Sequence, residues 1–213
     1  ITSSAKSLNI KKWDFGASFS NDFSVQVDKG IAKQLKASQK QVLTLRVWNK
    51  KNLVGITTTS DLSENGLKKA LYQANLASDY GNKNELTDFS PLAKDPIKDI
   101  KQAKRSPAGI KKLLETLRFA ESELLKKHSA IKTIPYNGLS ESFYKRIYAN
   151  SEGAQRSYAK SQAAIYLYAR AEENNRKPRS SGSVKIGYGL EDIDINSCID
   201  EAAEKTISHL NYS

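Results

Sequence analysis

Residues 23–39 read FSVQVDKGIAKQLKASQ, and residues 146–162, RIYANSEGAQRSYAKSQ, follow the same pattern 123 positions later. In each stretch an alternating run leads to a glycine, Gly30 or Gly153, and a Ser-Gln pair follows eight residues after that glycine. Alternation with a period of two is typical of a β-strand. A glycine between two such runs is typical of a hairpin turn. The chain therefore contains a duplicated β-hairpin.

A helical pattern follows each hairpin. Asp61-Leu62-Ser63 opens the first, and Asp192-Ile193-Asp194 opens the second 131 positions later. Two copies are too few for a solenoid, and one copy alone offers too little core to be stable. The sequence therefore predicts an α+β fold, in which duplicated β-hairpin-plus-helix units form a mainly antiparallel sheet with helices packed against it. We expect the copies to share one core and to place Ser38-Gln39 and Ser161-Gln162 equivalently.

The periodicity divides the chain into three stretches. They are a first repeat at about 14–81, a linker and helix at about 82–132, and a second repeat at about 133–212. Strands are predicted at about 15–27, 31–38, 41–48, 53–59, 133–139, 143–150, 155–171 and 183–190. Helices are predicted from Ser63 to Gly81, from Ser106-Pro107 to His128, and from Asn196 to Leu210.

Residues 1–213 are expected to form the N-terminal domain of a longer protein. The sequence contains no methionine and begins at Ile1, so either the chain is a piece of a longer protein or residues are missing from the sequence. We therefore expect a C-terminal domain that this chain does not contain.

The composition is that of a globular protein. Hydrophobic residues make up 38% of the chain and charged residues 27%, which is too apolar for a disordered protein. No apolar run is long enough to span a bilayer, and the N-terminal stretch lacks an apolar signal core. The single cysteine, Cys198, permits no intrachain disulfide. We therefore expect a cytoplasmic protein in which this thiol is buried filler.

The chain is basic, with 34 lysines and arginines against 23 acidic residues and a net charge of +11. Clustered basic residues can neutralise nucleic-acid phosphates. Here the clusters are spread along the whole chain and favour lysine, whereas base recognition relies on arginine and on aromatics among the basic residues. A solvated basic surface is the preferred interpretation, and direct nucleic-acid binding is the alternative.

Candidates for catalysis are few. The two histidines, His128 and His209, are far apart in sequence, and neither is followed by glutamate, so the helical motif of metalloproteases is absent. Together with Cys198 they are a poor supply of zinc ligands. Gly187-Tyr188-Gly189 lacks the third glycine and helix start of a dinucleotide-binding loop. We assign no catalytic, cofactor-binding or metal-binding residue to this chain.

Two further groups of polar residues have a structural and a functional interpretation. Asn150-Ser151-Glu152-Gly153 suits a tight turn between strands, and the alternative is a loop that presents Ser151 or Glu152 to a ligand. The carboxylate pairs Glu121/Glu123 and Glu201/Glu204 are expected on solvent-facing helix surfaces.

Several stretches resemble the N-terminal region of the PmbA/TldD family. They read KQLKASQ (33–39), LVGITTTSDLS (53–63), PYNGLSES (135–142) and RIYANSEG (146–153), followed by the closing pattern from Ala202 to Leu210. The resemblance extends from about Phe15 to Leu210, and the order and spacing of these stretches make it specific. The family is described as modulators of DNA gyrase and as TldD–TldE (PmbA) zinc metalloproteases that degrade or trim unfolded peptides. The resemblance implies an α+β domain that precedes a mainly β C-terminal domain.

The resemblance also implies where catalysis would lie. In the catalytic subunit type a His-Glu-x-x-x-His helix and a later cysteine hold the metal, outside the region that matches, and no position here fits that motif. Tyr136 to Ser142 is closer to the non-catalytic PmbA (TldE) branch. The expected role is a structural and substrate-gating domain with a homologous partner subunit, unfolded peptides as substrates, and zinc only in the catalytic partner. The alternatives are the accessory half of a zinc metallopeptidase whose motif lies beyond Ser213, and a basic DNA- or gyrase-binding module.

Overall fold

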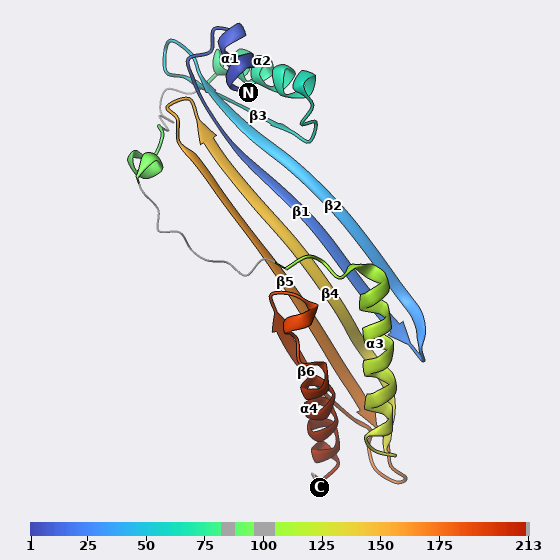
Figure 1. Ribbon diagram of the computed structural model, residues 1–213. Coiled ribbons are helices and arrows are strands. Elements are labelled where there is room, and N and C mark those ends of the chain that lie inside the picture. The colour runs from blue at the N-terminus through green and yellow to red at the C-terminus, as the bar shows by residue number, and fades with distance from the viewer. Residues whose placement is uncertain (82–87, 96–104, 212–213) are drawn as a thin grey trace. The chain divides into compact units, whose positions relative to one another are not determined.

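The computed structural model describes residues 1–81, 88–95 and 105–211 (Figure 1). The first half contains α1 (Thr2–Ser7), β1 (Lys12–Asp28), β2 (Ile31–Trp48), β3 (Val54–Thr59), α2 (Glu64–Ser78) and the short 3-10 helix η1 (Pro91–Lys94). The second half contains α3 (Gly109–Lys126), β4 (Ile131–Asn150), β5 (Gln155–Ala171), β6 (Arg179–Gly187), η2 (Leu190–Asp192), α4 (Ile195–Ser208) and η3 (His209–Asn211).

The strands form one sheet in the order β3-β2-β1-β4-β5-β6. Each copy contributes a long hairpin, β1–β2 or β4–β5, and an outer strand that pairs antiparallel with it. The helix after each outer strand packs on that strand, α2 on β3 and α4 on β6. The predicted α+β class and the duplicated hairpin-plus-helix units are confirmed. A short helix α1 precedes the first hairpin, and the longer α3 precedes the second.

Several predicted boundaries are wrong because the hairpin strands are longer than their patterns. β2 runs unbroken from Ile31 to Trp48, and β4 from Ile131 to Asn150, where the sequence predicted two strands each. β4 lies between β1 and β5, and β2 lies beside β1 and pairs with β3 only from Leu43 to Trp48, so pairing with a neighbouring long strand continues through polar stretches that lack an alternating pattern. β6 begins at Arg179, so the loop expected at 172–182 is shorter.

The predicted start of the central helix is also wrong. α3 begins at Gly109 with Ala108 at its N-cap, and Ser106 does not cap it. The Ala108 N–H donates instead to Glu141 Oε2 on β4, at 2.7 Å. A contact with a distant strand therefore sets this helix end. By contrast, Ser63 caps α2 as predicted, because its Oγ accepts the Gly66 N–H at 3.1 Å.

The two hairpin turns differ by one residue. The first is a two-residue turn in which Lys29 and Gly30 both have positive φ, 51° and 75°, the conformation that matches strand twist. The second encloses three residues, 151–153, with Gly153 at φ 90°. Ser38 and Ser161 each lie eight residues after the glycine of their turn, and Ser161 is buried whereas Ser38 is partly exposed. The expected equivalence of the two Ser-Gln pairs stays a prediction.

The chain divides into two compact units, each built from three separate segments. Unit 1 comprises residues 1–20, 40–101 and 144–159, and unit 2 comprises residues 21–39, 102–143 and 160–213. Each unit thus contains the outer strand and helix of one copy and the hairpin tip of the other. The buried side chains form a separate main cluster in each unit, so the expected single core is wrong.

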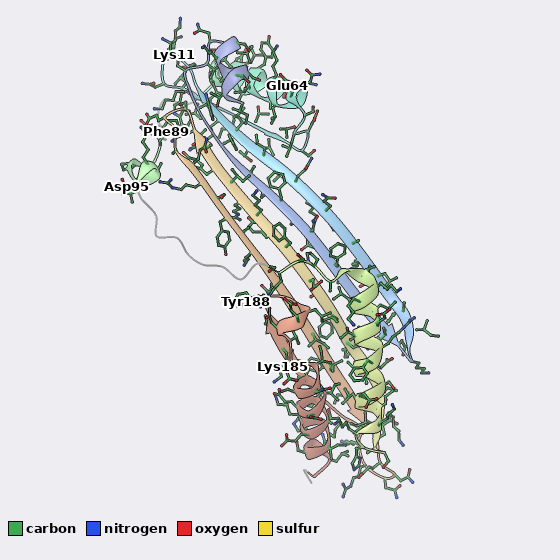
Figure 2. The ribbon with its side chains drawn as sticks, viewed as in Figure 1. Lys11, Glu64, Phe89, Asp95, Lys185 and Tyr188 are labelled. Atoms are coloured by element: carbon green, nitrogen blue, oxygen red, sulfur yellow. The ribbon has the colours of Figure 1, made fainter. Side chains whose placement is uncertain are left out.

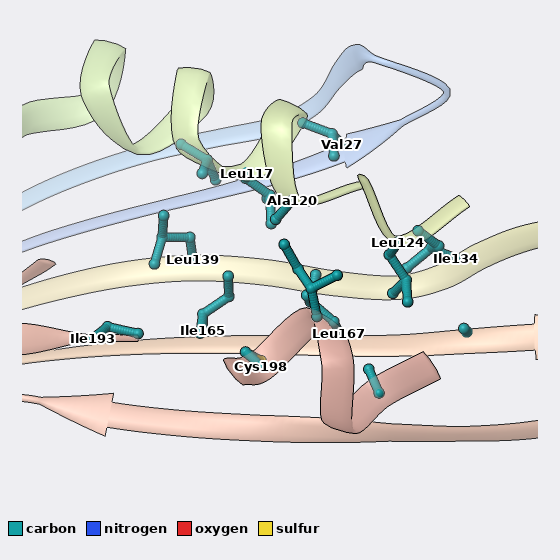
Figure 3. Close-up of a cluster of buried hydrophobic side chains, with 14 of the residues drawn as sticks. Val27, Leu117, Ala120, Leu124, Ile134, Leu139, Ile165, Leu167, Ile193 and Cys198 are labelled. Atoms are coloured by element: carbon teal, nitrogen blue, oxygen red, sulfur yellow. The ribbon is translucent and has the colours of Figure 1, made fainter. Parts of the chain in front are cut away.

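The core of unit 2 lies between α3, α4 and the strands beneath them. α3 buries Leu113, Leu117, Ala120 and Leu124, and Figure 3 shows Leu117 close to the strands that carry Leu139 and Ile165. Leu114, next to Leu113 on the helix, is only partly buried. Cys198 on α4 is fully buried, as predicted, and burial raises the pKa of its thiol.

The core of unit 1 lies where α2 packs on β2 and β3. Ala70, Leu71 and Ala74 of α2 pack with Leu43, Leu45 and Val47 of β2. Gly55 of β3 permits this approach, since a Cβ there would lie 1.9 Å from the Ala74 carbonyl oxygen. Across the described ranges, no helix combines the length and apolar character that crossing a membrane requires.

Candidate functional site

The histidines and the cysteine are not gathered into a site. His128 follows α3, and its Nδ1 accepts the Ala130 N–H at 3.1 Å, while His209 follows α4. Within residues 1–81, 88–95 and 105–211, no three His, Cys, Asp or Glu side chains come close enough to hold a metal ion. The assignment of no catalytic, cofactor or metal residue stays a prediction.

Residues 150–153 form the turn between β4 and β5. Asn150 Oδ1 accepts the N–H groups of Glu152 and Ala154, at 3.1 and 3.0 Å. The Ser151 N–H donates to the Trp13 carbonyl at 2.8 Å, and Ser151 Oγ accepts the Trp13 N–H at 3.3 Å. Glu152 pairs with Lys94 at 3.1 Å. These contacts hold the turn in unit 1, which favours the structural interpretation of the motif.

Two carboxylates have structural roles that the sequence did not indicate. Glu121 is only 4% exposed, and its two oxygens accept the N–H groups of Lys29 and Gly30 at the first hairpin turn, at 3.1 and 2.6 Å. Glu141 is equally buried and accepts from Ala108 and Leu190. The expectation that Glu121 faces solvent is therefore wrong, because the hairpin tip covers it.

Glu201 of α4 is partly exposed and binds three groups of unit 2. Its oxygens accept from Lys185 at 2.6 Å, from Lys205 at 2.5 Å and from Ser183 Oγ at 2.8 Å. These hydrogen bonds, the one from Lys185 first, lower the pKa of Glu201 from 4.5 to about 2. The bonds from Lys185 and Ser183 attach α4 to β6.

Unit 1 contains a half-buried polar cluster. The guanidinium of Arg46 binds both oxygens of the buried Asp14, and this hydrogen bonding raises the pKa of Arg46. Tyr148 donates its hydroxyl to Asp14 at 3.2 Å, and its pKa is raised, chiefly by burial. Arg46 also lies 5.0 Å from the centre of the Trp48 ring. Because each charge has a partner, the cluster stabilises the unit and offers no free acid or base.

The face of unit 2 opposite its buried core is lined by aromatic and aliphatic side chains. In β5 and β6, Ile165, Leu167 and Ser183 point into the core, so the residues between them point to the other face. This second face carries Tyr136 of β4, Tyr166 and Tyr168 of β5, and Val184 and Ile186 of β6; we call these five residues the tyrosine face. Tyr136 is 71% exposed, Val184 49% and Ile186 65%.

Two glycines allow the tyrosine rings to lie against the sheet. A Cβ on Gly138 would be 2.5 Å from the Tyr166 ring, and a Cβ on Gly182 would be 2.7 Å from the Tyr168 ring. The Tyr166 hydroxyl is also fixed, because it accepts a hydrogen bond from Gln26 Nε2 at 2.8 Å. The hydrogen bond from Gln26 therefore fixes the Tyr166 ring, and Gly182 leaves room for the Tyr168 ring against the sheet. Figure 2 labels Lys185 on the adjoining edge strand and Tyr188 beyond it.

α4 partly covers the free edge of β6. Thr206 Oγ1 donates to the Ser181 carbonyl at 3.0 Å, and Cys198 Sγ lies 3.8 Å from the Ser183 carbonyl. A strand that added to this edge would have to displace both contacts. The tyrosine face has no such cover among the described residues, so it is the better candidate for binding.

Comparison with known proteins identifies the family. Residues 103–210 match the family model described as the PmbA/TldA metallopeptidase central domain. The expectation that residues 1–213 form an N-terminal domain stays a prediction. A search of curated proteins finds no match.

Three solved structures share the fold. A Thermotoga maritima protein described as a candidate modulator of a DNA gyrase superposes with a TM-score of 0.80 at 16% identity, covering 99% of this chain and 47% of that one. TldE from Thermococcus kodakarensis superposes with a TM-score of 0.73 at 15% sequence identity, and the match covers 96% of this chain and 47% of TldE. A Bacteroides thetaiotaomicron protein, also described as a candidate gyrase modulator, superposes with a TM-score of 0.75 at 13% sequence identity. The match covers 100% of this chain and 49% of that one.

The chain spans about half the length of these structures. At such low identity the likeness concerns the fold, and the family assignment rests on the matched model, which covers just over half of the residues. The chain belongs to the PmbA/TldD family.

Proposed function

We propose that this chain is a structural and peptide-guiding domain of a PmbA/TldD-type assembly, of the non-catalytic subunit type. The observation that carries the proposal is the tyrosine face, which is exposed, largely apolar and has two of its rings lying against the sheet over Gly138 and Gly182. The partner we propose is a homologous subunit in the cytoplasm, and the substrate is an unfolded or extended peptide.

The chemistry of the tyrosine face suits a ligand of variable sequence. Tyrosine offers a large apolar ring and a hydroxyl with little conformational entropy to lose, so it contacts many different side chains. Ala164, two positions before Tyr166 and paired with Ile186, is a small residue on this face and leaves room there for an extended main chain to approach. Such a face would guide a peptide without selecting its sequence.

We further propose that the zinc of the assembly is held by a catalytic partner, and that this chain contributes no ligand to it. The alternative is that the chain is the accessory half of one zinc metallopeptidase whose motif lies elsewhere in the same protein. Zinc analysis and a peptidase assay of the full-length protein, alone and with its partner subunit, separate the two. Chelator-sensitive cleavage by the full-length protein alone would support the accessory-half alternative.

The DNA- or gyrase-binding alternative has less support. Several basic residues of the chain form ion pairs, including Lys126 with Glu123 at 2.8 Å and Lys127 with Asp200 at 2.5 Å. Binding through the remaining surface charge should be weak, indifferent to sequence and lost as salt rises. Titration with two unrelated DNA duplexes at two salt concentrations tests this.

The proposed function is tested by the anisotropy of a fluorescent, unstructured peptide mixed with the protein. The double variant Val184→Glu/Ile186→Glu places two charges on the tyrosine face and should weaken binding about tenfold, which corresponds to about 1.4 kcal/mol. Ile56→Glu is the matched control, because Ile56 is an exposed residue of the other outer strand, in unit 1. Equal binding by the double variant and the control would contradict the proposal.

A further inference from the structure

Residues 88–95 lie against the sheet of unit 1, to which they belong. Phe89 packs edge to face on Trp48, the last residue of β2, with the ring centres 5.1 Å apart. Asp88 forms an ion pair with Lys12, the first residue of β1, at 2.7 Å. The Lys12 ammonium also lies 5.2 Å from the centre of the Phe89 ring. An acidic residue and the aromatic residue that follows it are thus bound by one lysine and one tryptophan.

The charges around Trp48 determine what this place can bind. Two cations lie over the Trp48 ring, Lys12 at 5.3 Å and Arg46 at 5.0 Å from its centre. The charge of Arg46 is already balanced by the buried Asp14. The charge of Lys12 is balanced, among the described residues, by Asp88. Trp48 therefore accepts an aromatic ring, and Lys12 accepts the carboxylate beside that ring.

Residues 88–95 are attached in the way that a bound peptide is. At one end the segment places the Phe89 ring on Trp48, and at the other end Arg156 donates to the Asp95 carbonyl at 2.5 Å. The Asp88 side chain is 71% exposed, and exposed ion pairs contribute little to stability. The Phe89 ring is therefore the main anchor of these contacts, and a competing ring can displace it.

We propose that Lys12 and Trp48 form a second peptide-binding site, whose ligand is a polypeptide segment in which an aromatic residue directly follows an acidic one. Residues 88–95 are its intramolecular competitor. Because the segment is tethered to the site, it acts at a high effective concentration and excludes weak ligands. The inference uses contacts of unit 1 and no residue of the tyrosine face.

The test measures, by fluorescence anisotropy, the affinity of the protein for a labelled synthetic peptide with the sequence of residues 88–95, DFSPLAKD. Phe89→Ala in the protein removes the competing ring and should tighten binding at least about tenfold, as expected when a site is about nine-tenths occupied by its own chain. Leu92→Ala is the matched control, since Leu92 lies in the same segment and is 68% exposed. It should bind the peptide like the parent protein. Asp88→Asn, which weakens the competitor without removing a ring, should also tighten binding.

The same peptide locates the site. In the Phe89→Ala protein, Lys12→Gln should weaken binding at least about threefold, because it removes both the ion pair and the cation over the rings. Lys11→Gln is the control, since Lys11 is exposed, adjacent in sequence and carries the same charge; Figure 2 labels Lys11 and Phe89. Lys11→Gln should leave the affinity unchanged. Adding Val184→Glu/Ile186→Glu should also leave it unchanged, so this inference and the proposed function can fail separately.

Three results would overturn the proposal. Equal affinity of the parent and Phe89→Ala proteins would show that the segment does not compete for the site. No binding to either protein would show that residues 88–95 are a fixed part of unit 1. Equal weakening by Lys11→Gln and Lys12→Gln would show a general attraction between charges in place of a site.

Discussion

Replacing Glu121 with alanine should destabilise a hairpin turn that is more than 90 residues away in sequence. Glu121 of α3 accepts the N–H groups of Lys29 and Gly30 with its two oxygens, at 3.1 and 2.6 Å. The turn residues are exposed, whereas the carboxylate is 4% exposed. The substitution therefore removes two charge-assisted hydrogen bonds and the anchor that attaches the tip of the first hairpin to α3.

The size of the effect follows from the environment of each partner. A hydrogen bond to a charged group contributes about 1.5–3 kcal/mol to stability. Water can reach the exposed turn once the carboxylate is gone, so the lower end of that range applies to each bond. We expect Glu121→Ala to lower the free energy of unfolding by about 3 kcal/mol in total. Glu121→Gln keeps one accepting oxygen without the charge, so its free energy of unfolding should lie between those of Glu121→Ala and the parent protein.

The assay is urea unfolding followed by circular dichroism, together with amide exchange at Lys29 and Gly30. Glu123→Ala is the matched control, since Glu123 lies on the same helix, is partly exposed and pairs with Lys126 of its own helix at 2.8 Å. The control should change stability by less than about 0.5 kcal/mol. If Glu121→Ala and Glu123→Ala unfolded at the same urea concentration, the anchoring role of Glu121 would be refuted.

Three further predictions concern the core, the pH dependence and the contact between β3 and α2. Leu117→Ala should cost about 3 kcal/mol because the site is fully buried, and Leu114→Ala about 1 kcal/mol because it is partly exposed, both measured by urea unfolding. The pKa of Glu201 is lowered from 4.5 to about 2, so its stabilising effect is present above pH 4.5 and is lost as the pH falls towards 2. Glu201→Gln should therefore flatten the fall in Tm over that range, and an unchanged profile would contradict the assignment. Gly55→Ala should lower Tm sharply, since its Cβ would overlap the α2 backbone, whereas Gly16→Ala, with no atom within 4 Å, should lower it far less.

The sequence predicts those parts of the fold that depend on local chemistry. The hairpin turns at Gly30 and Gly153 and the cap at Ser63 are set by residues within a few positions of one another, and all three are found. The lengths of β2 and β4 are not predicted, because their middle sections are held by neighbouring strands rather than by an alternating pattern.

The buried carboxylates mark the limit of sequence reasoning. Glu121 and Glu141 bind main-chain N–H groups from segments far away in the sequence, so no local pattern distinguishes them from solvated glutamates. The tyrosine face was missed for a similar reason. Its members lie on three strands, and only the pairing of those strands and the two glycines beneath the rings bring them together.

The division of the two units has a consequence for how the protein is made. Unit 1 requires residues 144–159, so its core cannot be completed until the second hairpin has left the ribosome. Unit 2 requires residues 21–39, which are synthesised long before α3 and α4. A nascent chain therefore carries a first hairpin whose β1 has not yet paired with β4. Apolar residues such as Val25 stay exposed until most of the sequence has emerged. Contacts of such long sequence separation fold slowly and expose the chain to aggregation during synthesis. Cutting the gene between the two copies would therefore produce two incomplete pieces rather than two domains.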